Sequence, residues 1–328
     1  MSSSLIPVHV LTGFLGSGKT SLLRKLLSDP RLADTAVLIN EFGEVGLDHL
    51  LVRGLTEDVV LLSSGCVCCA LSDDLSATLA DLYRAQMTGE IPAFARVVLE
   101  TTGLADPLPI IRLLRMDSRL KSFFALGQVV TTVDAVNALH TMEIYGEAVQ
   151  QVAAADSLII TKTDMATEVE IERILQHIIA INPTARRLSY GRSDQPDSNE
   201  LFARSGESRD RTGLVSLQQG DHLATSAGIS SFVITLDKSV DLETFIDWLD
   251  LLLATRGDSI LRVKGYLAAN GYHTPLLIQG VQHILDRPEP MKDLPESAPL
   301  TQLVFIAKHV TKTAIERSIK SLLATSCS

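Results

Sequence analysis

Apolar residues gather in short, nearly continuous runs over the first half of the chain, and each run contains β-branched residues and ends in a polar loop. Continuous runs are typical of strands that are buried on both faces, so they predict a mostly parallel sheet flanked by helices. A ligand of such a sheet binds at the carboxyl ends of its strands. The predicted strands are residues 8–12, 36–40, 59–62, 96–100, 128–134 and 157–164.

Leucines between several of these runs recur at the three- and four-residue spacing of a helix that buries one face. They predict one helix directly after the first strand and another after the third. The leucines concerned are Leu22, Leu23, Leu26 and Leu27 in the first helix, and Leu75, Leu79 and Leu82 in the second.

The composition changes over residues 189–228, where Ser, Gly, Asp and Arg dominate, and this change predicts a linker or mobile loop. A second pattern of strands and helices follows, in which Asp241 is the expected N-cap of a helix. We therefore predict an α/β domain at residues 1–188 and a smaller α+β domain at residues 229–328. The elements predicted in the smaller domain are strand 231–237, helix 242–254, strands 261–268, 274–285 and 302–309, and helix 312–323.

The composition of the 328-residue sequence narrows the class of protein. It is 46% hydrophobic and 21% charged, an ordinary globular balance, and its formal net charge of −10 argues against nucleic acid as a partner. We find no apolar window that would span a membrane and no basic N-terminal segment typical of a signal peptide. Four cysteines, three of them adjacent, do not form a disulfide framework, so we expect free thiols in the reducing cytoplasm.

The segment GFLGSGKTS, residues 13–21, follows the first predicted strand and opens the first predicted helix. It satisfies the G-x-x-x-x-G-K-[ST] pattern of a phosphate-binding loop (P-loop), whose glycines let backbone N–H groups point at an anion. Lys19 is expected to reach the β- and γ-phosphates, and the Thr20 hydroxyl to bind Mg²⁺. A chance glycine-rich turn is the alternative, which the strand-loop-helix context disfavours. The residues assigned to the nucleotide are Gly13, Gly16, Ser17, Gly18, Lys19, Thr20 and Ser21.

Two further predicted strands end in residues that suit a nucleoside triphosphate. The fourth ends in Glu100, at the usual place of a second Mg²⁺ contact, and Gly103 follows with an N–H for a γ-phosphate. A surface carboxylate is the alternative for Glu100. The last predicted strand ends in TKTD, which is similar to the N-K-x-D guanine reader, in which Asp accepts from the guanine N1–H and the Lys stem packs on the base. Lys162 and Asp164 are therefore assigned to guanine, with Thr161 where Asn usually stands.

The segment NEFGEVGLD, residues 40–48, follows the second predicted strand, which is the place of a loop that senses the γ-phosphate. Its acidic residues Glu41, Glu44 and Asp48 are candidates to orient water, contact Mg²⁺ or bind another metal. Solvated loop acids are the alternative.

Cys66, Cys68 and Cys69, the cysteine triplet, lie between the predicted strand 59–62 and the second leucine-rich helix. This order places them at the same sheet edge as the P-loop and at a helix N-terminus, whose dipole favours thiolates. Thiolates select zinc, cuprous copper or iron–sulfur iron over Mg²⁺, and three of them leave tetrahedral zinc one ligand short. Small buried hydrophobes and a redox sensor are the alternatives. We treat His49, near the segment 40–48, as a surface residue, and His273 and His283, in the second domain, as structural residues.

The segments GFLGSGKT, NEFGEVGLD, GCVCC, ETTGLADP and TKTD, in this order, resemble the CobW-type P-loop GTPases, relatives of the GTPases that insert nickel into urease and hydrogenase. The segments LRVKGYLA and LLIQGVQ are similar to that family's C-terminal domain, so the resemblance covers nearly the whole chain. It implies a P-loop NTPase fold and a GTP-hydrolysing metallochaperone or insertase. This chain lacks the His-rich stretch of many members and has Ile39 where some carry an acidic residue.

We therefore predict a cytoplasmic GTPase that uses GTP, Mg²⁺ and zinc or another transition metal, and that hands the metal to a client metalloprotein. A homodimer is compatible with the sequence, and neither a membrane nor nucleic acid is expected as a partner. A regulatory nucleotide-binding module with redox-sensing thiols and a small-molecule kinase are the competing functions. The expected roles are catalysis for Lys19, Glu44 and Asp48, Mg²⁺ binding for Thr20 and Glu100, and transition-metal binding for Cys66, Cys68, Cys69 and Glu44.

Overall fold

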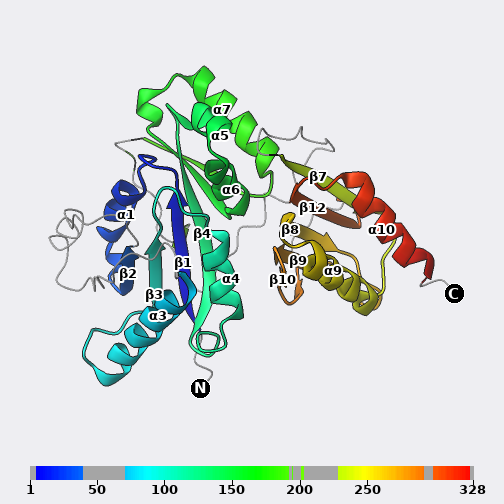
Figure 1. The fold of residues 1–328 in the computed structure, drawn as a ribbon, viewed down its shortest axis with the longest axis horizontal. Helices are drawn as coiled ribbons and strands as arrows, with labels where there is room; N and C mark the ends of the chain where they lie inside the picture. Colours follow the sequence, from blue (N-terminus) through cyan, green and yellow to red (C-terminus); the bar gives the residue numbers. More distant parts are fainter. Residues whose placement is uncertain are drawn as a thin grey trace. The chain divides into compact units, whose positions relative to one another are not determined.

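The computed structural model describes residues 5–39, 71–191, 194, 201–202, 228–291 and 298–325, with no side chains described at 71–74 and 323–325. The chain divides into two compact units, each built around its own sheet (Figure 1). The first unit contains residues 1–142, 150–174 and 186–209, and the second contains the remainder.

The first unit contains a six-stranded sheet in which every neighbouring pair is parallel, in the order β2-β3-β1-β4-β5-β6. This confirms the mostly parallel sheet, while the predicted strand 59–62 lies outside the described residues. The sequence analysis missed β6, because its arginines and serine break the apolar run. The strands are β1 (Ile6–Gly13), β2 (Thr35–Ile39), β3 (Arg96–Glu100), β4 (Phe124–Asp134), β5 (Ser157–Thr161) and β6 (Arg186–Tyr190).

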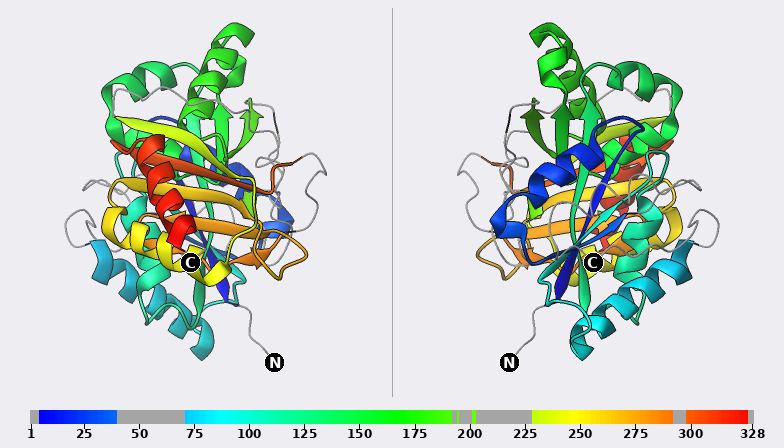
Figure 2. Two further views of the ribbon diagram at one scale, coloured as in Figure 1. Left: turned by 90° about the vertical axis from the view of Figure 1, so that its right-hand side faces the viewer. Right: turned by 90° about the vertical axis from the view of Figure 1, so that its left-hand side faces the viewer.

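Helices flank this sheet, with α1 against one face and α3 and α4 against the other (Figures 1 and 2). The leucines of α1 are buried against Leu11, Val98 and Val130 of the sheet, so the leucine spacing correctly predicted this helix. The helices from α1 to α7 are α1 (Lys19–Leu27), α3 (Leu71–Thr88), α4 (Leu108–Met116), α5 (Ala138–Ile144), α6 (Gly146–Ala154) and α7 (Glu168–Ile181), with short 3₁₀ turns η1 (Pro30–Leu32) and η2 (Thr163–Met165).

A bulge interrupts the pairing of β1 with β4 beside His9. The register shifts between Val8 and Val10, and the Gln128 N–H that leaves the ladder donates to His9 Nδ1 at 3.0 Å. Gly127 is required here, because a Cβ on it would lie 2.7 Å from His9 Nδ1. Burial of the ring, together with the nearby Arg96 charge, lowers the pKa of His9 to about 3, so the imidazole is neutral at physiological pH.

Part of the segment that we predicted as a linker contributes to the core of the first unit. Leu201 and Phe202 are almost fully buried, the Phe202 ring lies 5.1 Å from the His9 ring between centroids, and Arg96 Nη1 donates to the Phe202 carbonyl at 3.0 Å. Strand β6 also continues to Tyr190, two residues beyond the predicted domain end. The chain beyond residue 188 is therefore attached to the first sheet at these positions.

The second unit contains an antiparallel sheet in the order β10-β9-β8-β12-β7, with β11 paired to β9. The predicted strand 274–285 is wrong near its end, because the chain turns at Gln282, which has a φ of +50°, and pairs back on itself. The elements are β7 (Ile229–Leu236), α9 (Leu242–Arg256), β8 (Ile260–Leu267), β9 (Leu276–Val281), β10 (Ile284–Leu285), β11 (Glu289–Pro290), β12 (Thr301–Lys308) and α10 (Lys312–Thr325).

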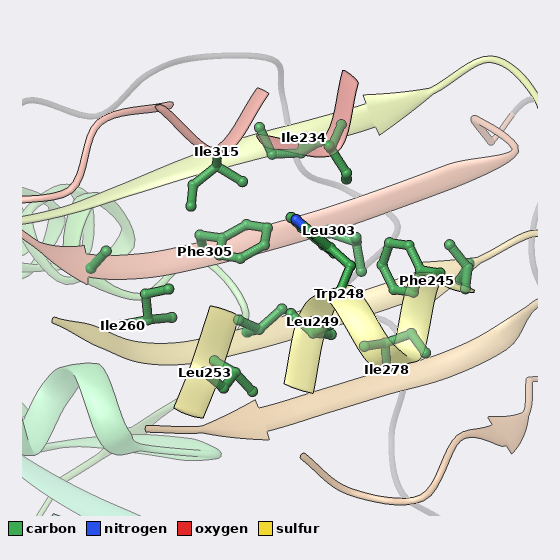
Figure 3. Packing of buried hydrophobic residues seen from close by; sticks show 14 of the residues in the cluster. Ile234, Phe245, Trp248, Leu249, Leu253, Ile260, Ile278, Leu303, Phe305 and Ile315 are labelled. Carbon is green, nitrogen blue, oxygen red and sulfur yellow. The ribbon is translucent and has the colours of Figure 1, made fainter. Parts of the chain in front are cut away.

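Helices α9 and α10 cover one face of this sheet and enclose an apolar core (Figure 3). Phe232 and Phe305 stack at 5.6 Å between centroids, and Trp248 from α9 packs nearby, its Nε1–H donating to Ser318 Oγ at 2.8 Å. Asp241 caps α9 by accepting from the Thr244 N–H at 2.9 Å, which confirms the predicted N-cap. Among the described helices of both units, none is long and apolar enough to cross a membrane.

Candidate nucleotide site

The P-loop runs from the end of β1 into α1 and depends on three glycines with positive φ. Gly13, Gly16 and Gly18 have φ values of +141°, +71° and +91°, which strain any residue with a side chain. Gly13 also lacks space for one, because a Cβ there would lie 2.2 Å from Thr132 Oγ1. The glycines at these positions of the motif are therefore required by the backbone of the loop.

Lys19 folds back over the P-loop that precedes it. Its ammonium group donates to the Gly13 carbonyl at 2.9 Å and to the Phe14 carbonyl at 3.2 Å, and the residue is 8% exposed. The charge is thus held at the loop and close to the N-terminus of α1, where a phosphate binds in P-loop proteins. The arrangement fits the anion-binding role expected of this lysine.

Hydroxyl groups from two strand ends fasten the P-loop to the sheet. Ser17 Oγ and Thr132 Oγ1 of β4 lie 2.7 Å apart, and Thr161 Oγ1 of β5 donates to the Ser17 carbonyl at 2.7 Å. Thr161 stands where the guanine-reading motif usually has Asn, and its hydroxyl makes a direct bond to the P-loop from that position. Although Thr161 replaces the usual Asn, its hydroxyl group still connects the end of β5 to the P-loop.

Thr20 and Glu100, which we predicted to support Mg²⁺, lie side by side. The Thr20 hydroxyl donates to Glu100 Oε1 at 2.6 Å, and Glu100 is buried at the end of β3. A hydroxyl and a carboxylate are the hard oxygen groups that Mg²⁺ accepts as ligands. Ile39 is the register partner of Glu100 on β2, so the acid that some family members carry is replaced here by an apolar side chain.

Residues 101–105, the Gly103 loop, leave the end of β3 and pass directly beside the P-loop. A Cβ on Gly103 would lie 2.6 Å from the backbone nitrogen of Leu15, so only glycine permits this approach. Thr101 Oγ1 donates to Thr12 Oγ1 at 2.8 Å, and Gln151 Nε2 of α6 donates to the carbonyls of Gly103 and Ala105. The sequence analysis missed Gln151, although a polar residue within the apolar segment 148–155 is a signal that could have found it.

Lys162, assigned to guanine, is held by an acidic residue that the sequence analysis did not consider. Its backbone has a φ of +58°, and its ammonium group lies 2.7 Å from Asp134 Oδ2 at the end of β4. Burial by itself raises the pKa of Asp134, but hydrogen bonds from Lys162, Asn137 and the Val136 N–H outweigh it and hold that pKa below its ordinary value. Asp164, the other guanine candidate, is exposed at the start of η2.

The remaining predicted site residues lie outside the described residues. These are Glu41, Glu44, Asp48, Cys66, Cys68 and Cys69, and His49, which we treat as a surface residue, also lies outside the described residues. Within the described part of the chain, no group of three or more His, Cys, Asp or Glu side chains could hold a metal ion. His273 is exposed, and His283 Nε2 lies 3.0 Å from Asp258 Oδ1.

Helix α3 begins at Leu71, two residues after the cysteine triplet, and it is bonded to the residue that follows α4, the helix after the Gly103 loop. The buried Ser76 hydroxyl donates to Asp117 Oδ2 at 2.5 Å, immediately after α4. Further along, the ring of Tyr83 stacks on Phe123 at 4.2 Å between centroids. Helix α3 is thus joined to the segment between α4 and β4 by a hydrogen bond and by ring stacking.

Comparison with known proteins gives matches over both parts of the chain. Residues 7–189 match the family described as CobW/HypB/UreG, nucleotide-binding domain, and residues 229–323 match the cobalamin synthesis protein cobW C-terminal domain. A zinc chaperone, YjiA of Escherichia coli, is 35% identical over 321 residues, which cover 97% of this chain and 98% of that protein. A zinc-regulated GTPase metalloprotein activator of Schizosaccharomyces pombe is 37% identical over 209 residues, covering 60% of this chain and 48% of that one.

Solved structures give the same result. The crystal structure of Zn(II)-bound YjiA GTPase from E. coli matches with a TM-score of 0.76 and 32% identity, covering 97% of this chain and 99% of that one. A Zn(II)-bound triple variant of YjiA, with one glutamate and two cysteines changed to alanine, matches with a TM-score of 0.73 and 30% identity, at the same coverage. The fold, the P-loop and both matched segments agree, and the chain therefore belongs to the CobW/HypB/UreG family of nucleotide-binding proteins, with a CobW-type C-terminal domain.

Proposed function

We propose that this chain is a GTPase that binds zinc at the cysteine triplet and delivers it to a client metalloprotein. The observation that carries the proposal is the hydrogen bond between Ser76 and Asp117. It joins the helix that follows the cysteine triplet to Asp117 at the C-terminal end of α4, the helix that follows the Gly103 loop. We propose that a change at the nucleotide phosphates reaches the thiols through these two helices. Relatives named as zinc chaperones and as a zinc-regulated GTPase support the metal and the reaction.

The carboxyl ends of β1, β3 and β4 suit the phosphates and Mg²⁺ of a nucleotide. The P-loop N–H groups and Lys19 would hold the β- and γ-phosphates, and Thr20 with Glu100 would hold Mg²⁺. When bound, the ion supplies neutralisation of the charge that develops on the phosphates. Glu44 and Asp48 are our proposed groups for orienting the attacking water.

The end of β5 suits guanine as the base. Asp134 holds the ammonium group of Lys162, which leaves the lysine stem, only partly exposed, as a flat apolar surface for a purine. Asp164 is exposed two residues further along and, as a carboxylate, accepts from the N1–H and amine of guanine. Adenine offers no donor at its N1 position, so we propose GTP as the substrate in preference to ATP.

The cysteine triplet suits zinc as a metal that is carried and released. Three thiolates leave tetrahedral zinc one ligand short, and we propose Glu44 as the fourth ligand within the chain. An open or exchangeable position lets a ligand of the client replace one from the carrier. We further propose that the cysteines remain reduced in the cytoplasm and that two chains can associate as a homodimer.

The metal assignment is tested by changing Cys66, Cys68 and Cys69 together to Ala, with Cys327→Ala as the matched control. We expect the control to bind about one tight zinc ion per chain and the triple variant to lose it, because the thiolates supply most of the ligands. The measurement is competition with a zinc-binding dye on reduced protein.

A zinc-bound crystal alone would not decide the question, because a relative's variant lacking two cysteines and a glutamate also crystallised with zinc. The affinity is therefore the quantity to compare. Equal zinc affinity in the triple variant and in Cys327→Ala would contradict the proposed site and would favour the function with redox-sensing thiols.

A further inference from the structure

We propose that Gln151 of α6 is a positioning residue for γ-phosphate recognition, acting through the Gly103 loop. This inference rests on the proposed GTPase function. Gln151 is 1% exposed, and its side-chain amide donates to the Gly103 carbonyl at 3.1 Å and to the Ala105 carbonyl at 3.0 Å. Both hydrogens of one amide group are thus used on the loop that we expect to contact the γ-phosphate.

The amide of Gln151 has one favourable orientation. Turned over, its oxygen would face the same two carbonyl oxygens and repel them. Gln151 Oε1 is itself buried without a hydrogen-bond partner among the described residues. Keeping that oxygen unsatisfied costs free energy, so the two bonds to the loop must outweigh the cost. The orientation is set by the Gly103 loop and by nothing else described around the amide.

The helix that carries Gln151 is fixed to the sheet independently of this side chain. Thr131 Oγ1 of β4 donates to the Gln151 backbone carbonyl at 2.9 Å. The amide therefore extends from a fixed point, and its reach sets where the carbonyls of the Gly103 loop can lie. Because a peptide unit is planar, holding these carbonyls directly orients the N–H groups of Leu104 and Asp106, and it also fixes the Gly103 Cα, from which the Gly103 N–H extends.

The Gly103 loop has little freedom on its other side. The Gly103 backbone lies so close to Leu15 that a Cβ would meet the Leu15 nitrogen at 2.6 Å. Between the two bonded carbonyls, the Leu104 side chain is exposed. The loop is thus pressed between the P-loop and the Gln151 amide, and small shifts of it change whether the Gly103 N–H faces a γ-phosphate.

This arrangement allows the site to distinguish nucleotides that have a γ-phosphate from those that lack one. The P-loop and Lys19 suit the phosphates that GTP and GDP share, whereas the Gly103 N–H serves only the third. Loss of the Gln151 amide should therefore weaken GTP binding and hydrolysis while GDP binding is kept. A purely structural role would weaken the binding of both nucleotides together.

The test compares Gln151→Leu with Gln150→Leu, which changes a chemically identical neighbour on the same helix. Affinities for fluorescent GDP and for a fluorescent non-hydrolysable GTP analogue are measured with Mg²⁺, together with kcat and KM for GTP. For Gln151→Leu we expect affinity for the analogue to fall roughly tenfold, because two buried carbonyls lose their donor, and affinity for GDP to stay within about twofold. The kcat for GTP hydrolysis should fall together with the affinity for the analogue. The affinities and the kcat of Gln150→Leu should equal those of the wild type.

Gln151→Glu provides a second readout that does not depend on the stability of the leucine variant. The introduced carboxylate faces two carbonyls in a buried position, and both effects favour its protonated form, which can donate one hydrogen bond. Hydrolysis by this variant, relative to wild type, should therefore recover as the pH is lowered from about 8 to about 6.

If Gln151→Leu loses GDP and analogue binding equally, or loses neither, the inference is overturned. It is also overturned if the hydrolysis rate of Gln151→Glu, relative to wild type, does not change with pH. A wild-type chain that binds no guanine nucleotide would overturn the proposed function as well. If the ratio of analogue affinity to GDP affinity is the same in the wild type and in Gln151→Leu, only the role of Gln151 is overturned.

Discussion

The two sheets of this protein use their buried positions for different purposes. In the parallel sheet, buried polar residues collect where the strands end, and they bond to one another and to the loops that follow. In the antiparallel sheet, the face under α9 and α10 is apolar and rich in aromatic rings (Figure 3). The polar residues at the strand ends are Thr12, Glu100, Thr101, Thr132, Asp134 and Thr161. The apolar core includes Phe232 and Phe305 of the antiparallel sheet and Phe245, Trp248, Leu249 and Ile315 of the two helices.

This difference between the two sheets indicates which substitutions should affect nucleotide binding and which should affect the free energy of unfolding. A buried polar group contributes little net stability even when it is bonded, but its bonds fix the position of a loop. Buried aromatic and aliphatic side chains contribute most of the stability of a unit and position nothing at the strand ends. We therefore expect changes at the parallel sheet's carboxyl edge to alter nucleotide affinity, and changes in the apolar core of the second unit to alter only its unfolding.

Phe305→Ala should give the largest effect and should be confined to the second unit. Phe305 is fully buried and stacks on Phe232, so its removal should lower the free energy of unfolding of this unit by about 3–5 kcal/mol. Trp248, the single tryptophan of the chain, lies in the same core, and its fluorescence reports the transition in urea.

Leu251→Ala is the matched control, because Leu251 is on α9 and is 64% exposed. It should change the stability by less than about 0.5 kcal/mol. A loss of the same size in both variants would contradict the picture of a second unit stabilised by this buried core.

Lys19→Met should give the next largest effect, and only on nucleotide binding. Removing a buried cation from a phosphate site costs about 3 kcal/mol, on the order of a hundredfold in affinity for GDP and GTP. Lys121→Met changes an exposed lysine near the start of β4, at the opposite edge of the sheet, and should leave both affinities unchanged. Equal affinities for the two variants, measured by equilibrium titration, would show that the carboxyl edge does not hold the phosphates.

His9 should give a smaller, pH-dependent effect on the first unit. Its folded-state pKa of about 3 lies below the ordinary 6.5, so the stability that the neutral ring contributes is present above about pH 6.5 and is lost as the pH falls toward 3. At about pH 5 the free energy of unfolding should be lower by roughly 2 kcal/mol than it is well above pH 6.5.

His9→Gln should remove this part of the pH dependence, since glutamine does not titrate and can still accept from the Gln128 N–H. His273→Gln, at an exposed histidine, should keep it. Urea unfolding followed by circular dichroism at several pH values is the measurement. An unchanged slope of stability against pH in His9→Gln would rule out the neutral buried ring as its source.

The sequence predicted the elements that local pattern determines. Continuous apolar runs indicated five of the six strands of the parallel sheet, and the glycine spacing indicated the P-loop. Thr20 and Glu100, 80 residues apart, were placed together because the carboxyl ends of parallel strands share one edge. Strand β6 was missed because a polar edge strand has no apolar run, and the turn at Gln282 because neither Gly nor Asn marks it.

Contacts that depend on packing between elements could not be read from the sequence. Gln151 and Asp134 look like ordinary polar residues until α6 and β4 are placed beside the loops that they hold. The burial of Phe202, inside a segment with a linker-like composition, could not be predicted for the same reason, because only the folded unit places its ring beside His9. The roles of Glu44, Asp48 and the cysteine triplet remain predictions, since these residues lie outside the described part of the chain.

The most direct test of the central claim, that nucleotide state controls zinc binding at the cysteine triplet, is the zinc affinity of the reduced chain in two states. One sample is saturated with GDP and Mg²⁺, and the other with a non-hydrolysable GTP analogue and Mg²⁺. We predict that the two zinc dissociation constants differ by roughly tenfold, and that zinc changes the ratio of the two nucleotide affinities by the same factor, as linkage requires. Zinc affinities that agree within about twofold would contradict the coupling.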